Sequence, residues 1–137
     1  MNKFIMTIFG ASGDLTRRKL MPALYYLHKE KRLPDGFTII GTGRTAYSNE
    51  SYQAFILENL KQFVPIKHQI ESELESFVQK IYYLPMDPEN GAEYIHLYQL
   101  ITKITQNNSP EDLLFYLATP PSLYVVIPRQ LKKIGLN

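Results

Sequence analysis

The chain carries two glycines, three residues apart, directly after an apolar run near its start. The run covers residues 4–9, and the segment after it reads Gly10-Ala11-Ser12-Gly13-Asp14-Leu15-Thr16. Glycine permits a tight turn and a close approach of the backbone, and free amides at the start of a helix attract anions. Between a strand and a helix, this turn would be suited to binding the pyrophosphate of a dinucleotide.

The spacing of these residues does not by itself decide between a ligand site and a plain turn. Ser12 and Leu15 stand where the fingerprint G-x-G-x-x-G has its second and third glycines, and the P-loop pattern also fails at Leu15. A strand-to-helix turn that binds nothing, capped by Asp14 or Thr16, remains the alternative. In either interpretation we expect Asp14 to point away from the phosphates and to cap backbone amides.

A second apolar run, residues 37–41, leads into a loop that carries Arg44. NAD enzymes place an acidic residue near this point, where it accepts a hydrogen bond from the ribose 2′-hydroxyl. The first carboxylate here is Glu50, whereas the planar guanidinium of Arg44 suits a 2′-phosphate, so NADP is favoured over NAD. A solvated loop arginine is the alternative. Further hydroxyl donors for the phosphate would come from Thr42, Thr45 and Ser48.

Few other residues suggest chemistry. Lys19, one helical turn after the glycines, could reach into the cleft as a point charge for an anionic substrate. The histidines lie in helical or polar stretches, so we expect them at the surface and expect no catalytic base and no metal site. They are His28, His68 and His96.

The composition excludes several classes of protein. The 137 residues include no cysteine, which rules out disulfides and thiolate chemistry. The formal net charge of +2 is dispersed and too small for a nucleic-acid interface. Signal-peptide and membrane-spanning patterns are absent from the sequence. We therefore expect a folded, cytoplasmic protein without nucleic-acid or membrane partners.

Strand and helix patterns alternate along the chain. Continuous apolar runs predict buried strands over residues 4–9 and 37–41, and we expect a short strand over residues 80–84 and a fourth strand over residues 113–118. Apolar residues at helical spacing predict helices over residues 16–31, 48–63, 71–79, 91–105 and 122–133. This order predicts an α/β fold, a Rossmann-like doubly wound parallel sheet. With about four strands the sheet would be incomplete, and we expect the chain to be truncated.

Three segments together resemble one known family. Residues 10–20, with Pro22-Ala23-Leu24-Tyr25, closely resemble the signature of the glucose-6-phosphate dehydrogenases. Gly41-Thr42-Gly43-Arg44 and Phe115-Tyr116-Leu117-Ala118-Thr119-Pro120-Pro121 match two further blocks of this family in the same order. Thr119 departs from the pattern, since many relatives carry leucine there. The resemblance spans essentially the whole chain.

The resemblance implies a role for each matching position. The turn from Gly10 to Thr16 would hold the NADP pyrophosphate, and Arg44 would hold the 2′-phosphate. Tyr116 would lie near the nicotinamide half, Asp87 near the adenine, and Lys19 would face the sugar phosphate. The implied cofactor-binding set is Gly10, Ala11, Ser12, Gly13, Asp14, Leu15, Thr16, Arg44, Asp87 and Tyr116.

The resemblance also implies the reaction. The whole enzyme, expected as a homo-oligomer, would oxidise glucose 6-phosphate to 6-phosphogluconolactone by hydride transfer to NADP in the pentose phosphate pathway. Residues 1–137 would be its N-terminal NADP-binding domain, without the C-terminal substrate domain and the catalytic base. We therefore expect no dehydrogenase activity from this chain alone. A free-standing NADP-binding or regulatory module and a folded fragment that binds nothing remain the alternatives.

Overall fold

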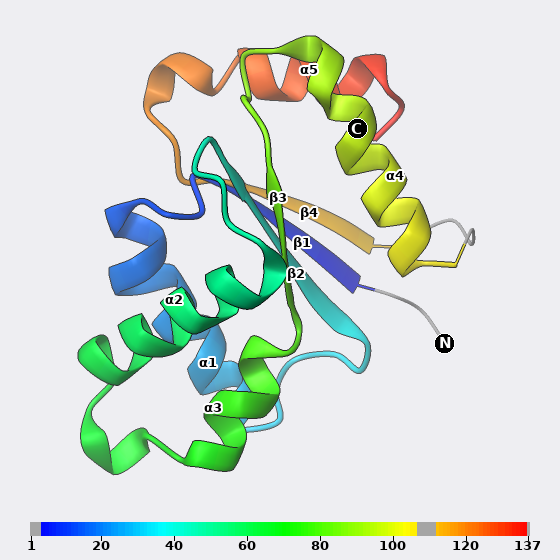
Figure 1. Ribbon diagram of the computed structural model, residues 1–137. Helices are drawn as coiled ribbons and strands as arrows, with labels where there is room; N and C mark the ends of the chain where they lie inside the picture. Colours follow the sequence, from blue (N-terminus) through cyan, green and yellow to red (C-terminus); the bar gives the residue numbers. More distant parts are fainter. Residues whose placement is uncertain (1–3, 107–111, 137) are drawn as a thin grey trace.

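The computed structural model describes residues 4–106 and 112–136. Four strands form one sheet in the order β3-β2-β1-β4, and every pairing is parallel (Figure 1). The strands are β1 (Phe4–Phe9), β2 (Phe37–Gly43), β3 (Ile81–Pro85) and β4 (Asp112–Leu117). The predicted Rossmann-like α/β fold with four parallel strands is confirmed.

Helices cover both faces of the sheet (Figure 1). One face carries α1 (Met21–Lys29), α2 (Asn49–Phe63) and α3 (Glu71–Val78), and the other carries α4 (Tyr94–Ile104) and α5 (Val126–Lys133). Short helical turns η2 (Ile66–His68) and η3 (Gly91–Glu93) precede α3 and α4.

Central strand β1 is buried from both sides. Met6 and Ile8 pack into the α1, α2 and α3 layer, whereas Ile5 and Phe9 pack into the α4 and α5 layer. All four side chains are at most 4% exposed. A strand between two helical layers needs mainly apolar side chains on both faces, which explains the apolar run in the sequence; Thr7 is the one polar residue of β1 and is also buried.

The order of the strands creates a switch point beside β1. The chain leads from β1 to β2 and β3 on one side, and then crosses to β4 on the other side of β1. Phe9, at the end of β1, stands opposite Thr42 of β2 and Leu117 of β4. In open α/β sheets, ligands bind at the carboxyl ends of the strands beside such a switch point.

The first helix differs from the single helix predicted over residues 16–31. A π-helical turn, η1 (Thr16–Leu20), comes first, and the Met21 amide donates to the Thr16 carbonyl five residues earlier. The cause is Pro22, the second residue of α1. Proline has no amide, and its ring would clash with the carbonyl four residues earlier in a continuous α-helix, so the wider turn accommodates it.

The last predicted helix, residues 122–133, is divided in two. A short turn, η4 (Pro121–Leu123), is separated by Tyr124 and Val125 from α5. Pro128 lies in the first turn of α5, where its missing amide costs no hydrogen bond. In one continuous helix the same residue would leave the Tyr124 carbonyl without a donor, so proline places the break before α5 instead of kinking a helix.

Within residues 4–106 and 112–136, no helix is both long enough and apolar enough to cross a membrane. α2, with 15 residues, has polar and charged side chains on its outer face, among them Glu50, Glu58 and Lys61.

Candidate functional site

A cleft of about 290 Å³ opens at the carboxyl ends of β1 and β2. Four segments line it: the glycine turn after β1, the loops after β2 and β3, and the segment after β4. Four of the predicted cofactor-binding residues take part in this lining, namely Gly10, Ser12, Gly13 and Arg44. The cleft therefore joins the glycine turn and the arginine that the sequence singled out.

Gly10 is required by the packing of the chain itself. Its φ of 88° lies in the left-handed region that side chains disfavour. A Cβ atom there would also contact the Ala118 carbonyl group, 2.8 Å from its carbon. The Ala118 amide donates to the Phe9 carbonyl at 2.8 Å, which fixes the ends of β1 and β4 against each other. Only glycine fits between them.

Gly13 is different, because the chain leaves room for a side chain there. Its φ lies outside the left-handed region, and the Gly10 carbonyl oxygen, at 3.4 Å, is the one atom within 4 Å of a Cβ placed on it. Because Gly13 has no side chain, the wall of the cleft at this position consists of backbone atoms alone. This is the arrangement that a phosphate needs in order to reach backbone amides.

The amides of the turn divide into two groups. Those of Gly10 and Ala11 both donate to the Thr42 carbonyl at 3.1 Å, and the Gly13 amide donates to the Gly10 carbonyl at 3.1 Å. The amides of Ser12, Asp14, Leu15 and Thr16 meet no acceptor within the described residues, but Thr16 is fully buried, so a ligand could reach only the first three. The expected phosphate donors thus narrow to these three, since the first two amides of the turn tie β1 to β2.

Asp14 does not cap the helix, so the expectation that it caps backbone amides is wrong. Its carboxylate accepts from Arg17 Nη1 at 2.8 Å, and its side chain is 76% exposed and outside the cleft lining. Arg17, one turn later, offers a charged donor that competes with neutral amides. The Thr16 hydroxyl donates back to the Gly10 carbonyl at 2.9 Å and is buried. Neither residue has the capping role considered for it.

Ala11 lies beneath the cleft and not in its wall. It is fully buried, and its carbonyl accepts from the Tyr52 hydroxyl at 2.6 Å. Tyr52 comes from α2, and a Cβ on Gly41 would lie only 3.0 Å from its ring. Burial raises the pKa of Tyr52, which keeps its hydroxyl a donor. Helical spacing predicted the helix over residues 48–63, but nothing in the sequence marked the Tyr52 hydroxyl as a partner of the turn.

Arg44 stands at the rim of the cleft and is paired. Its Nε and Nη2 atoms lie 3.2 and 3.1 Å from Asp87 Oδ1, and Nη2 lies 3.3 Å from Glu89 Oε2. The Glu89 amide and then the Arg44 guanidinium lower the pKa of Asp87, so its carboxyl is charged at neutral pH. Asp87 and Arg44 therefore lie together, on the same edge of the sheet as the glycine turn.

Two of the three hydroxyls expected to help Arg44 have other partners. The Thr42 hydroxyl donates to the Leu84 carbonyl at 2.6 Å, in a buried position. The Ser48 hydroxyl accepts from the Ser51 amide at 3.0 Å and caps α2. Thr45 lines the cleft, and its carbonyl accepts from the Tyr83 hydroxyl at 2.7 Å. Thr45 is thus the member of this set that stays beside Arg44.

The remaining predicted residues lie away from this cleft. Leu15 and Lys19 are exposed and outside its lining. Tyr116, on β4, packs against the α1, α2 and α3 layer, and the wall after β4 consists of Ala118, Thr119 and Pro120. None of the three histidines lines the cleft. Within the described residues, no group of three carboxylate or imidazole side chains could hold a metal ion.

Comparison with known proteins gives one family. Residues 7–137 match the family model described as glucose-6-phosphate dehydrogenase, NAD binding domain. A glucose-6-phosphate 1-dehydrogenase of Treponema pallidum is 41% identical over 134 residues, which is 97% of this chain and 26% of that protein. The corresponding protein of Aggregatibacter actinomycetemcomitans is 40% identical, over 96% of this chain and 26% of its own length.

Solved structures agree with this result. A glucose-6-phosphate dehydrogenase in complex with its substrate glucose-6-phosphate superposes with a TM-score of 0.83 at 31% identity, covering 96% of this chain and 27% of its own. A glucose-6-phosphate 1-dehydrogenase from Mycobacterium avium shares the fold, with a TM-score of 0.81 at 24% identity, over 99% of this chain and 28% of its own. The chain spans about a quarter of the length of the curated relatives it matches. It belongs to the glucose-6-phosphate dehydrogenase family, in the NAD-binding domain that binds a nicotinamide dinucleotide.

Proposed function

We propose that the cleft after β1 and β2 binds NADP, with its pyrophosphate on the glycine turn and its ribose 2′-phosphate at Arg44. One observation carries this proposal: Ser12 with its free backbone amide, Gly13 without a side chain, and the Arg44 guanidinium line the same cleft, and the free amides of Asp14 and Leu15 follow directly in the chain. The donors for the pyrophosphate are the amides of Ser12, Asp14 and Leu15.

NADP is preferred over NAD because of the charge beside the adenosine ribose. The loop after β2 presents Arg44 and no carboxylate of its own before Glu50. A guanidinium can form two parallel hydrogen bonds with a phosphate, whereas a ribose hydroxyl gains little from it. Asp87, beside Arg44, would then lie near the adenosine half of the cofactor.

The cleft is small for a dinucleotide. Sites for drug-sized ligands measure roughly 300–1,000 Å³, and this cleft of about 290 Å³ lies just below that range. We propose that it holds the pyrophosphate and the adenosine ribose. The nicotinamide half would extend past Ala118 toward Tyr116, and Lys19 would face the sugar phosphate.

The family suggests the reaction of the whole protein. We propose that it oxidises glucose 6-phosphate in the cytoplasm as a homo-oligomer, with residues 1–137 as the dinucleotide-binding domain. NADP would accept the hydride, and this chain would bind and orient it. A base must take the proton of the sugar hydroxyl, and no histidine of this chain lines the cleft. We therefore expect no turnover of glucose 6-phosphate by the 137-residue chain alone.

Calorimetric titration of the purified chain with NADP and with NAD tests the proposed function. We expect both nucleotides to bind, and NADP to bind more tightly. Arg44→Ala should weaken NADP binding by about tenfold, which equals about 1.4 kcal/mol, and leave NAD binding unchanged. Arg32→Ala is the matched control, because Arg32 is an exposed arginine outside the cleft. Equal effects of the two substitutions would contradict the assignment of Arg44.

Gly13→Ala tests the glycine turn itself. The added methyl group has room in the folded chain, so the variant should unfold at the same temperature as the original within a few degrees. It would stand between the ligand and the backbone, so both nucleotides should bind about tenfold more weakly. Unchanged binding of both nucleotides would exclude this turn as the pyrophosphate site.

A further inference from the structure

Arg44 is already engaged by carboxylates before any ligand enters the cleft. Two of its nitrogen atoms contact Asp87, and one of these also contacts Glu89 at 3.3 Å. All three side chains are partly exposed, at 62%, 42% and 58%. The guanidinium therefore balances two negative charges at the rim, and any anion that binds there must compete with them.

The loop that carries these carboxylates is held in place. The Met86 amide donates to the Gly43 carbonyl at 2.9 Å, which joins this loop to the one carrying Arg44. The Tyr94 hydroxyl, from α4, donates to the Pro88 carbonyl at 2.6 Å in a buried position. Asp87 Oδ1 also accepts from the Glu89 amide at 2.9 Å. The backbone of this loop is thus held in place, so the carboxylates can leave Arg44 only by rotation of their side chains.

A third carboxylate lies behind this pair. The Asp87 amide donates to Glu93 Oε1 at 3.4 Å, and Glu93 stands in the turn before α4. Within the described residues Arg44 is the cation paired with Asp87 and Glu89. The net charge of Arg44 together with Asp87, Glu89 and Glu93 is therefore negative.

We propose that Asp87 and Glu89 compete with the ribose 2′-phosphate for Arg44 and so set how strongly this chain prefers NADP over NAD. The inference deepens the proposed function and rests on it. A phosphate monoester carries a charge of about −1.5 to −2 at neutral pH, so it and the two carboxylates are alternative anionic partners of the same guanidinium. NAD has a neutral hydroxyl at this position and does not compete for Arg44. The carboxylates therefore reduce the preference that Arg44 alone would give.

Glu89 offers the cleaner test of the two carboxylates. Its side chain contacts Arg44 and makes no other hydrogen bond or ion pair within the described residues. Asp87 also accepts the Glu89 amide, so its replacement disturbs the loop. Glu89→Gln removes one charge and keeps the shape of the side chain.

The experiment is titration of the wild-type chain, Glu89→Gln and Asp87→Asn with NADP and with NAD. Glu89→Gln should tighten NADP binding by up to about fivefold, the upper end of what exposed ion pairs contribute, and leave NAD binding unchanged. Asp87→Asn should change the ratio of the two affinities in the same direction. Glu58→Gln is the control, because it removes one negative charge from an exposed position on α2 outside the cleft lining. It should change neither affinity.

Arg44→Ala distinguishes competition for Arg44 from a direct effect of the carboxylate charges on the bound phosphate. If the carboxylates act through Arg44, Glu89→Gln should have no effect on NADP binding in an Arg44→Ala background. A gain that persists there would overturn the proposed competition, as would an unchanged ratio in both single variants. In those cases NADP binding that depends on Arg44 would still support the proposed function. Binding of neither nucleotide to the wild-type chain would reject both.

Discussion

The Tyr52 hydroxyl donates a hydrogen bond of 2.6 Å to the Ala11 carbonyl, and this bond joins α2 to the turn that forms the floor of the cleft. Both groups are buried, and the two residues lie 41 positions apart in the chain. The Tyr52 ring also packs on that of Tyr83, with their centroids 4.6 Å apart. The glycine turn is therefore held from below by an aromatic cluster that the β2-to-β3 crossover supplies.

Tyr52→Phe should lower the free energy of unfolding by about 1–2 kcal/mol, because it leaves the buried Ala11 carbonyl without a donor. Urea denaturation measures the difference. Tyr47→Phe serves as the control, since Tyr47 belongs to the same cluster and its hydroxyl makes no hydrogen bond within the described residues. Equal stability losses in the two variants would show that ring packing, and not the hydrogen bond, holds the turn.

Gly10→Ala should destabilise the chain far more than Gly13→Ala. At Gly10 the new Cβ combines a left-handed φ of 88° with a clash against the Ala118 carbonyl, which together cost about 2–4 kcal/mol. At Gly13 the Cβ has room, and we expect a change below about 1 kcal/mol. Thermal and urea unfolding of both variants measure the contrast. Similar losses at the two positions would mean that the turn has another conformation in solution.

Stability should decrease at alkaline pH because burial raises the pKa of three tyrosines, Tyr52, Tyr83 and Tyr94. Burial raises the pKa of Tyr83 and of Tyr94 from 10.0 to about 12. Below pH 10 the folded and the unfolded chain both keep the tyrosine protons, so these groups do not make the free energy of unfolding depend on pH. Between pH 10 and about 12 the unfolded chain releases them first, and each tyrosine removes up to about 1.4 kcal/mol per pH unit. Urea unfolding at several pH values should show this slope, and Tyr94→Phe should reduce it. An identical slope in the variant would contradict the raised pKa.

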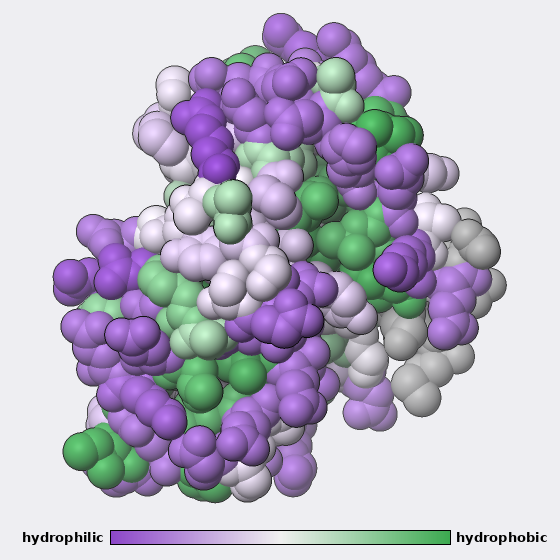
Figure 2. Space-filling model, viewed as in Figure 1, coloured by the Kyte–Doolittle hydropathy of each residue, from purple (hydrophilic) through white to green (hydrophobic). Residues whose placement is uncertain are grey.

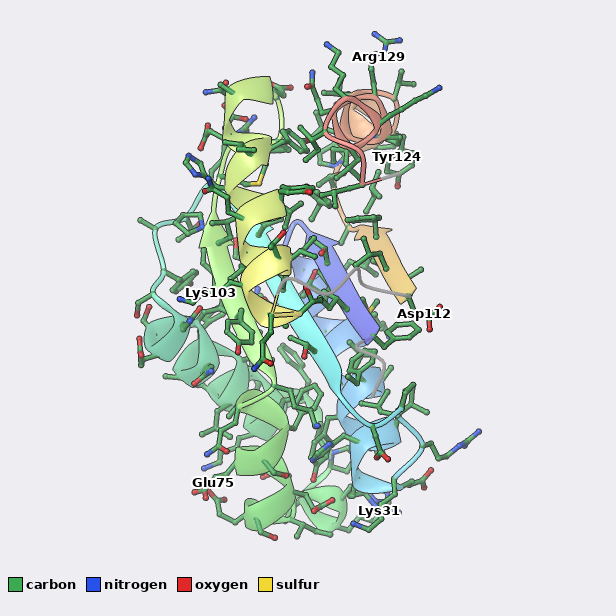
Figure 3. The ribbon with its side chains drawn as sticks, turned by 90° about the vertical axis from the view of Figure 1, so that its right-hand side faces the viewer. Lys31, Glu75, Lys103, Asp112, Tyr124 and Arg129 are labelled. Atoms are coloured by element: carbon green, nitrogen blue, oxygen red, sulfur yellow. The ribbon has the colours of Figure 1, made fainter. Side chains whose placement is uncertain are left out.

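The chain should self-associate through the edge of its sheet. Within the described residues β4, which begins at the labelled Asp112 in Figure 3, pairs with β1 alone. Leu114 on β4 is 46% exposed, and Ile95 and Tyr98 on α4 are exposed as well. Hydrophobic residues form a visible patch near α4 in Figure 2. Unpaired strand edges and apolar patches promote association. Sedimentation should detect dimers or larger species at high protein concentration, and a clean monomer there would refute this expectation.

Leu114→Lys locates the contact. A lysine on an edge strand opposes pairing with a second chain, so this variant should shift the equilibrium toward the monomer. Ile66→Lys is the control, because Ile66 is 85% exposed in η2, which lies away from the sheet edge. An equal shift in both variants would indicate a general effect of charge on solubility.

Local pattern was sufficient to predict the layers of the fold. The continuous apolar runs marked β1 and β2 because these strands are buried between the helical layers, and the glycines marked the turn after β1. The two helix boundaries that differ both involve proline, at Pro22 and Pro128. In each case proline has no amide to donate to the carbonyl four residues earlier, and this determined where the helix changed. Hydrophobic periodicity alone does not show such a change.

The partners of the site residues could not be predicted from local pattern. The Thr42 carbonyl accepts hydrogen bonds from the amides of Gly10 and Ala11, and Asp87 forms an ion pair with Arg44, 43 residues away in the chain. These contacts depend on the sheet register, which brings the ends of β1, β2 and β3 together. The sequence marked Arg44 as a phosphate ligand because its own loop has no carboxylate before Glu50. In the structure, the loop after β3 brings the carboxylates of Asp87 and Glu89 to Arg44.

The most direct test of the proposed cofactor site is nitrogen-15 NMR of the labelled chain during addition of NADP. The amides of Ser12, Asp14 and Leu15 should show the largest chemical-shift changes, because they are the free donors of the turn. The amides of Gly10 and Ala11, bonded to Thr42, should shift less. Saturable shifts confined to another part of the chain, or no shifts at all, would contradict the assignment of the glycine turn as the pyrophosphate site.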